Sequence, residues 1–167
     1  NPIDFVRAQT PAGEALAIYS SAQALSAHRP GDRPMALDFR TIGLTALVET
    51  GGRIVVNPGT DAVLLPRPAV AALAQGDEWL PAWRDGSLRE LLLAEATAAC
   101  PAIVDIDIAY AGEGLTRVLV AVDRASFAQG ADASAMKETL SAALNAVGAN
   151  PRLIASADRV EIAPVLR

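Results

Sequence analysis

The chain has 167 residues, of which 51% are hydrophobic and 20% are charged, and its formal net charge is −5. This length and composition suffice for one domain with a full core or for two small α/β modules. A net acidic chain lacks the basic surface that nucleic-acid binding requires. Because Cys100 is the only cysteine, an intrachain disulfide and a cysteine-rich metal site are excluded. We therefore expect a cytoplasmic protein, and no stretch of about 18 apolar residues predicts a membrane span.

The first part of the chain reads as strands alternating with helices. An apolar run after Pro11-Ala12-Gly13 predicts a strand over Glu14–Ser20, and Ser20 or Ser21 caps a short helix that ends near His28. The further predicted elements of this part are a loop at Arg29–Pro34, a strand at Met35–Phe39, a helix from the N-cap Asp38 to Gly51-Gly52, strands at Arg53–Asn57 and Ala62–Leu65, and a helix from Pro68 to about Gln75.

The turn Asn57-Pro58-Gly59 has the clearest local chemistry in the sequence. Asn57 opens the turn, Pro58 presets φ, and Gly59 supplies the positive φ that a type II turn requires. The amides that follow the turn are candidates for an anion-binding nest, although the adjacent Asp61 opposes an anion and a plain strand-ending turn explains the same residues.

The second part of the chain begins after Gly76–Gly86, a segment with two glycines and a proline that predicts a domain boundary. The predicted elements beyond it are a helix at Leu88–Cys100 capped by Ser87, a strand at Val104–Ala109, a hairpin turn at Gly112–Gly114, a central strand at Arg117–Val122, a helix that Asp132 or Ser134 caps and Gly148 closes, and strands at Arg152–Ala157 and Arg159–Ala163. The predicted fold class is α/β (α+β): two small mixed-sheet modules with helices packed on them.

Two short segments carry a resemblance to a known family. Tyr19-Ser20-Ser21, between a strand and a short helix, and Val55-Val56-Asn57-Pro58-Gly59 together resemble the opening and the asparagine-proline turn of the enhanced-serine-sensitivity (SseB) proteins. The resemblance implies a bacterial protein with an SseB N-terminal module over residues 1–78 and an SseB C-terminal module over residues 86–167. It implies no catalytic residue and no cofactor.

Three groups of polar residues were weighed for chemistry. Asp105 and Asp107 lie two apart on one predicted strand, so their carboxylates share a face about 7 Å apart. They are the candidate metal ligands or acid–base pair, although the solvated face of an amphipathic strand is the favoured explanation. His28, the only histidine, is the only imidazole for a catalytic triad, but its place near a predicted helix end favours an ordinary exposed imidazole. A third group, Arg29, Arg33 and Arg40, surrounds one loop as a solvated surface or as the lining of an anion-binding cleft.

Trp79 and Trp83 are the candidate partner-binding residues. They lie four residues apart around Leu80 and Pro81, so one helical turn would place both rings on one face. Large aromatic side chains are enriched at binding hot spots. The favoured interpretation is that the two rings fill the seam between the two modules, and partner contact is the second interpretation.

The function that these observations favour is a non-enzymatic interaction or regulatory module of a bacterial cytoplasmic protein, with a protein partner or a second copy bound at an exposed apolar patch or sheet edge. Neither nucleic acid nor membrane is an expected partner. The alternative is a small-ligand- or metal-binding enzyme that uses Asp105 and Asp107, or a cleft lined by the Arg29–Arg40 group.

Overall fold

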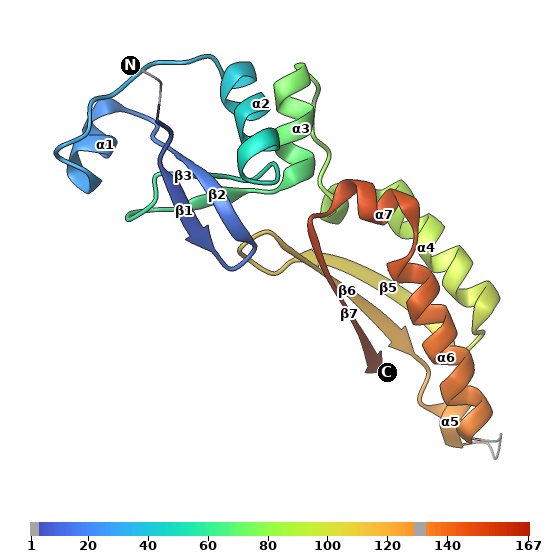
Figure 1. Cartoon of the computed structure of the whole chain (residues 1–167). Coiled ribbons are helices and arrows are strands. Elements are labelled where there is room, and N and C mark those ends of the chain that lie inside the picture. Colours follow the sequence, from blue (N-terminus) through green and yellow to red (C-terminus); the bar gives the residue numbers. More distant parts are fainter. Residues whose placement is uncertain (1–3, 129–132) are drawn as a thin grey trace. The chain divides into compact units, whose positions relative to one another are not determined.

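The computed structural model describes residues 4–128 and 133–167 and separates into two compact units, Asn1–Trp79 and Leu80–Arg167 (Figure 1). Each unit is a mixed β-sheet with helices packed on it. The predicted α+β fold class is therefore confirmed.

The N-terminal unit is built on a four-stranded sheet of order β1-β2-β3-β4. Its β2 and β3 are parallel, and its two other strand pairs are antiparallel. One face packs against α2 and α3 through the buried side chains of Leu16, Ala46, Ile54 and Val70. The elements are β1 (Arg7–Thr10), β2 (Gly13–Ile18), α1 (Ala22–His28), α2 (Phe39–Glu49), β3 (Ile54–Val56), β4 (Val63–Leu65) and α3 (Arg67–Gln75).

The predicted helix caps of this unit are confirmed. Ser21 caps α1 by accepting a hydrogen bond from the amide of Ala24, and Asp38 caps α2 by accepting one from Thr41. The predicted strand at Met35–Phe39 is wrong, because residues 35–38 form an extended approach to α2 without a strand partner. The apolar side chains that suggested a strand line a cleft instead, as described below.

The C-terminal unit is built on a three-stranded sheet of order β5-β6-β7 with β6 at its centre. Helices α4 and α6 supply buried side chains to the core on one face of the sheet. The elements are a 3-10 turn η1 (Ala82–Arg84), α4 (Gly86–Ala99), β5 (Ile103–Tyr110), β6 (Leu115–Val122), α5 (Ala125–Ala128), α6 (Ala133–Gly148), α7 (Pro151–Ser156) and β7 (Arg159–Leu166).

Three sequence assignments in this unit need correction or comment. Asp85, not Ser87, caps α4, because its carboxylate accepts the amide hydrogen of Leu88. The predicted strand at Arg152–Ala157 is the helix α7, whose start is fixed by the Asn150 side chain accepting two amide hydrogen bonds and by a proline at the first helical position. Of the two caps predicted for α6, Ser134 lies within the helix and Asp132 lies outside the described residues.

Both sheets share one topology. In each, an antiparallel hairpin is followed by a helical crossover to a strand that lies parallel to the second hairpin strand, so β1-β2-β3 corresponds to β5-β6-β7. In both units the residue after the third strand is hydrogen-bonded to the last residue of the second. The amide of Asn57 donates to the carbonyl of Ile18, and the amide of Arg167 donates to the carbonyl of Val122. A short helix follows the second hairpin strand in both cases.

We expect Asp85→Ala to destabilise the protein by about 1 kcal/mol at pH 7, because it removes the N-cap of α4. Hydrogen bonds from the Ser87 hydroxyl and the Leu88 amide, helped by Arg152 and opposed by burial, lower the pKa of the Asp85 carboxyl. A lowered pKa in the folded state means that the stabilisation is present above the unfolded value of about 3.9 and is lost as the pH falls through the folded value.

Urea unfolding of both proteins between pH 3 and 7 measures this effect. The difference between wild type and Asp85→Ala should shrink below about pH 4. Glu90→Ala is the control, because Glu90 is exposed on the same helix. A difference of constant size at every pH would contradict the assignment of Asp85 as an ionised cap.

Candidate functional site

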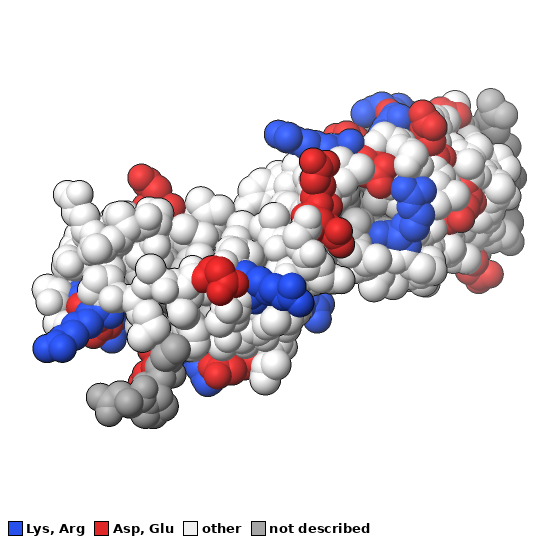
Figure 2. All heavy atoms as spheres, turned by 90° about the horizontal axis from the view of Figure 1, so that it is seen from above, with Lys and Arg blue, Asp and Glu red and all other residues white. Residues whose placement is uncertain are grey.

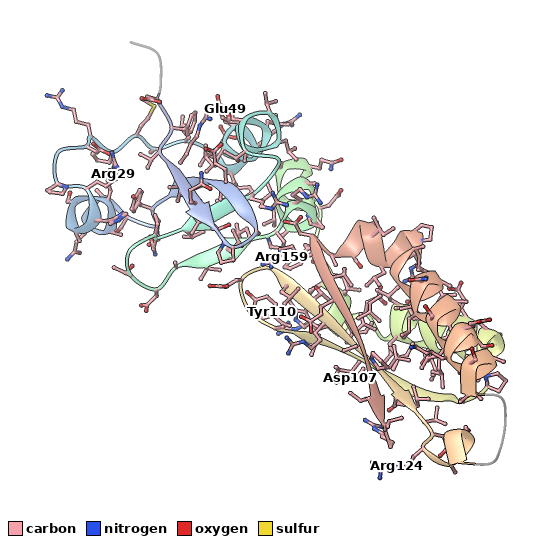
Figure 3. All side chains as sticks on the ribbon, turned by 60° about the horizontal axis from the view of Figure 1, so that its bottom comes forward. Arg29, Glu49, Asp107, Tyr110, Arg124 and Arg159 are labelled. Atoms are coloured by element: carbon pink, nitrogen blue, oxygen red, sulfur yellow. The ribbon has the colours of Figure 1, made fainter. Side chains whose placement is uncertain are left out.

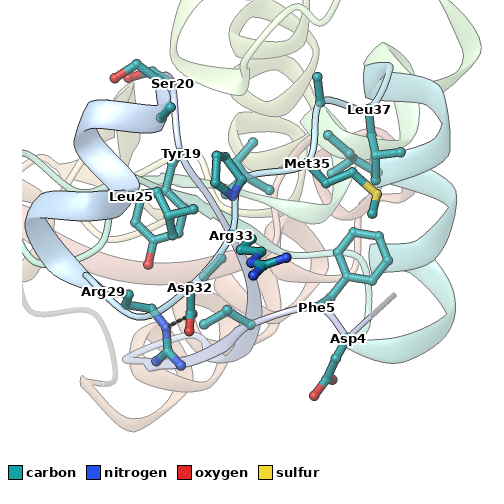
Figure 4. A pocket seen from close by; sticks show the side chains of 18 of the residues that line it. Asp4, Phe5, Tyr19, Ser20, Leu25, Arg29, Asp32, Arg33, Met35 and Leu37 are labelled. Atoms are coloured by element: carbon teal, nitrogen blue, oxygen red, sulfur yellow. Dashed lines mark hydrogen bonds and ion pairs between the residues drawn. The ribbon is translucent and has the colours of Figure 1, made fainter. Parts of the chain in front are cut away.

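A cleft of about 1020 Å³ opens in the N-terminal unit at the carboxyl end of β2 (Figure 4). The loop over residues 29–37, between α1 and α2, supplies one side of the lining, and residues 4–7 with the end of β2 supply the other. The carboxyl ends of parallel strands are the usual place for ligands in α/β sheets. This cleft is therefore the candidate functional site.

Apolar side chains form much of the lining. Leu25 is buried, whereas Met35, in the loop before α2, leaves 60% of its surface exposed to solvent. An exposed methionine beside partly buried apolar side chains is a surface that adapts to different partners. The apolar lining residues from the chain start, α1, the loop and α2 are Phe5, Val6, Leu25, Met35, Leu37 and Ile42.

The charged side chains of the cleft differ in their partners. Arg29 donates a hydrogen bond to Asp32, which raises the pKa of the arginine, so both charges are paired. Arg33 forms no ion pair with any residue that the structure describes. Its side chain lines the cleft together with those of Leu25 and Phe5, and the carboxylate of Asp4 points away from its guanidinium (Figure 4).

The two segments that carried the family resemblance meet at the edge of this cleft. The amide of Ser20 donates to the Asn57 side-chain oxygen at 2.9 Å, and the Asn57 side-chain nitrogen donates to the Ser20 hydroxyl at 3.0 Å. The turn has the predicted form, because Gly59 has a φ of 93° and the amide of Thr60 donates to the carbonyl of Asn57. The turn therefore fixes the Tyr19–Ser21 segment, which lines the cleft.

His28 packs on this turn. Its Nδ1 lies 2.9 Å from the Tyr19 hydroxyl, and burial raises the pKa of that phenol. A Cβ placed on Gly59 would lie 2.5 Å from His28 Cδ2, so the imidazole covers the residue where an anion nest was predicted. The nest itself stays a prediction.

We expect Asn57→Ala to cost about 1–2 kcal/mol, because it removes the hydrogen bonds to Ser20 and places a Cβ residue without a polar side chain at a φ of 51°. Asn57→Gly tolerates this φ and loses only the hydrogen bonds, so it should cost less. Thermal unfolding of the two variants separates the contributions. If both variants unfold at the same temperature as wild type, Asn57 does not hold the two segments together.

The predicted carboxylate pair lies in the C-terminal unit, on β5. The Asp105 oxygens pair with Arg89 at 2.5 Å and Arg167 at 2.9 Å. Although partial burial raises the pKa of Asp105, these arginines and the Ile106 amide hold it below its usual range. Asp107 is exposed on the sheet face opposite the buried Ile106 (Figure 3).

This environment makes Asp105 a link between α4, β5 and the end of β7. In the part of the chain that the structure describes, no three His, Cys, Asp or Glu side chains gather where a metal ion would bind. A metal at Asp105 would have to displace two guanidinium groups.

The remaining predicted residues lie outside the cleft. Trp83 is half-buried against the C-terminal core, with its ring centroid 4.9 Å from that of Tyr110, and Trp79 is half-buried at the end of the N-terminal unit. Cys100 is fully buried at the end of α4. Partner binding by the two tryptophans stays a prediction.

The surface charge is mixed, and the described helices are short or polar. On the face drawn in Figure 2, acidic and basic side chains are interspersed among wide uncharged areas, and no large basic patch is visible. Within the described ranges, no helix has the length and apolar character needed to span a membrane.

Sequence comparison agrees with the fold at the N-terminal unit. Residues 2–72 match the family model described as the SseB protein N-terminal domain, a span that includes the Tyr19–Ser21 and Asn57–Gly59 segments and the cleft lining from Asp4 to Ile42. The predicted resemblance is thus confirmed for this unit, whereas the SseB assignment of residues 86–167 stays a prediction. No curated protein and no solved structure shows a significant match to the chain.

Proposed function

We propose that this chain is a non-enzymatic interaction module of an SseB-like bacterial cytoplasmic protein, and that it binds a segment of a partner protein in the cleft of its N-terminal unit. The observation that supports this function best is the combination of an apolar lining with an exposed Met35 and with a guanidinium, that of Arg33, that has no ion pair among the described residues. Protein-binding surfaces use methionine, aromatic and arginine side chains in this way.

The polar groups beside the cleft support binding rather than catalysis. The Ser21 hydroxyl caps α1, the Ser20 hydroxyl is bonded to Asn57, and the His28 ring is bonded to Tyr19. A nucleophile needs a base within hydrogen-bond reach, whereas the Ser20 hydroxyl is engaged in joining the two family segments and the Ser21 hydroxyl in holding the start of α1.

The free edge of β7 is a less suitable docking site than the cleft. Arg167 directs both its amide and its carbonyl toward β6, and these directions alternate along a strand. The backbone nitrogen of Pro164 therefore faces the free edge, where it offers no donor, a common protection against strand addition. Self-association through this edge is disfavoured for the same reason.

Selection of random peptides displayed on phage against the immobilised full chain tests the proposed function. We expect enriched peptides to bind wild type and to lose at least about tenfold in affinity for Met35→Glu, which places a charge in the apolar lining. Val48→Glu is the matched control, because Val48 is 85% exposed on α2 and does not line the cleft. Failure to enrich any peptide, or equal binding to Met35→Glu, would overturn the proposal.

A further inference from the structure

We infer that the bound segment carries an acidic side chain that pairs with Arg33, next to an aliphatic or aromatic side chain that packs against the apolar lining. This inference rests on the proposed function and adds the chemical class of the partner.

Arg33 differs from the other arginines near the cleft. Arg7 pairs with Glu14 and Glu49, and Arg29 pairs with Asp32. Arg40 lies on α2 and does not line the cleft. Of the three lining arginines, Arg33 is therefore the one whose charge the described residues leave unpaired.

The two acidic side chains of the lining do not compensate Arg33. Asp32 is engaged by Arg29, and the carboxylate of Asp4 points away from the guanidinium (Figure 4). A carboxylate brought by a partner would thus meet a guanidinium that no described residue pairs, and its planar donors suit bidentate binding.

Apolar surroundings strengthen the case for a mixed acidic and apolar segment. The Arg33 side chain shares the cleft lining with Phe5 and Leu25, and Met35 and Leu37 extend this lining (Figure 4). Shielding from water strengthens a charge pair, and an apolar side chain next to the carboxylate provides that shielding. Because the whole chain has a net charge of −5, attraction of an acidic segment has to come from this local contact rather than from long-range steering.

The test compares the peptides that are selected by wild type with those selected by charge-altered variants. Wild type should enrich Asp or Glu next to an apolar residue, and Arg33→Glu should bind those peptides at least tenfold more weakly and should enrich Lys or Arg in their place. Arg40→Glu, an exposed charge reversal outside the cleft, should leave selection unchanged.

A double-mutant cycle makes the assignment specific. Replacing the acidic residue of a selected peptide with Ala should weaken binding to wild type and should have little further effect on Arg33→Leu, which keeps the apolar stem without the charge. Equal effects in both backgrounds, or selected peptides without an acidic residue, would overturn the inference. The proposed function would still stand if those peptides bind Met35→Glu more weakly than wild type. A titration with inorganic phosphate that shifts the NMR signals of Arg33, with no peptide enriched, would overturn both in favour of a small-anion site.

Discussion

Leu92→Ala is expected to destabilise the C-terminal unit by about 2–5 kcal/mol, the usual cost of removing a fully buried leucine side chain. Leu92 has no solvent exposure and lies on α4 between Leu88 and Ala96, all three of which belong to the core against β5 and β6. The cavity has few means of closing, because the sheet supplies β-branched side chains with restricted rotamers. Since whole domains have stabilities of about 5–15 kcal/mol, this single change removes a large fraction of the total.

Hydrogen exchange measured by mass spectrometry locates the effect. Amides of β5, β6 and α4 should exchange faster in Leu92→Ala, because their protection depends on opening of this core. Leu91→Ala is the matched control, since Leu91 is on the same helix, only half-buried and outside the core cluster. If both variants change exchange equally, Leu92 is not at the centre of the core.

The sequence predicted most elements because their local signals and their environments agree. Asp38 and Ser21 are strong N-caps, and Asn57-Pro58-Gly59 fits one turn type, so both helix starts and the β3–β4 turn follow from local chemistry. The strand β6 was recognisable as central because it is apolar on both faces.

The two wrong strand predictions have different causes. In one, strand-favouring side chains follow a stronger helix-capping signal; in the other, no neighbouring strand pairs with the apolar segment. Residues 152–157 contain β-branched and aliphatic side chains, yet Asn150 and Pro151 specify a helix start that outweighs this preference. Met35 and Leu37 suggested a strand, but no neighbouring strand pairs with them. Whether a segment pairs as a strand depends on the tertiary structure around it and cannot be predicted from the segment alone.

The candidate site was predictable only in part. Arg29 and Arg33 were recognised from the sequence as a group beside one loop, and the structure places both in the cleft, while Arg40 lies outside it. The apolar lining comes from the chain start, α1, the loop and α2. Residues as distant as Phe5 and Ile42 share this lining only because the β1–β2 hairpin and the crossover helices bring them together. The apolar run Met35-Ala36-Leu37, between a proline-rich loop and a helix cap, was the one local signal that could have indicated it.

Gly59→Ala is expected to cost about 2–3 kcal/mol, the second large effect, and it tests the contact between the two family segments. Gly59 has a φ of 93°, and an added Cβ would lie 2.5 Å from His28 Cδ2. The backbone strain of a residue with a side chain costs about 1–3 kcal/mol. Rotating the imidazole away would also break its contact with the Tyr19 hydroxyl, at about 0.5–1.5 kcal/mol for one hydrogen bond.

Denaturant unfolding of five proteins (wild type, Gly59→Ala, Gly31→Ala, His28→Ala and the His28→Ala/Gly59→Ala double variant) separates the two causes. Gly31→Ala is the control in the same unit, because its Cβ would meet no atom within 4 Å. Its free energy of unfolding should lie within about 0.5 kcal/mol of that of wild type. Introducing Gly59→Ala into a His28→Ala background should cost less than in wild type, since only the backbone strain remains. An equal cost in both backgrounds would show that His28 does not press on the turn. The Asn57–Gly59 turn would then hold the Tyr19–Ser21 side of the cleft through the Asn57 hydrogen bonds alone.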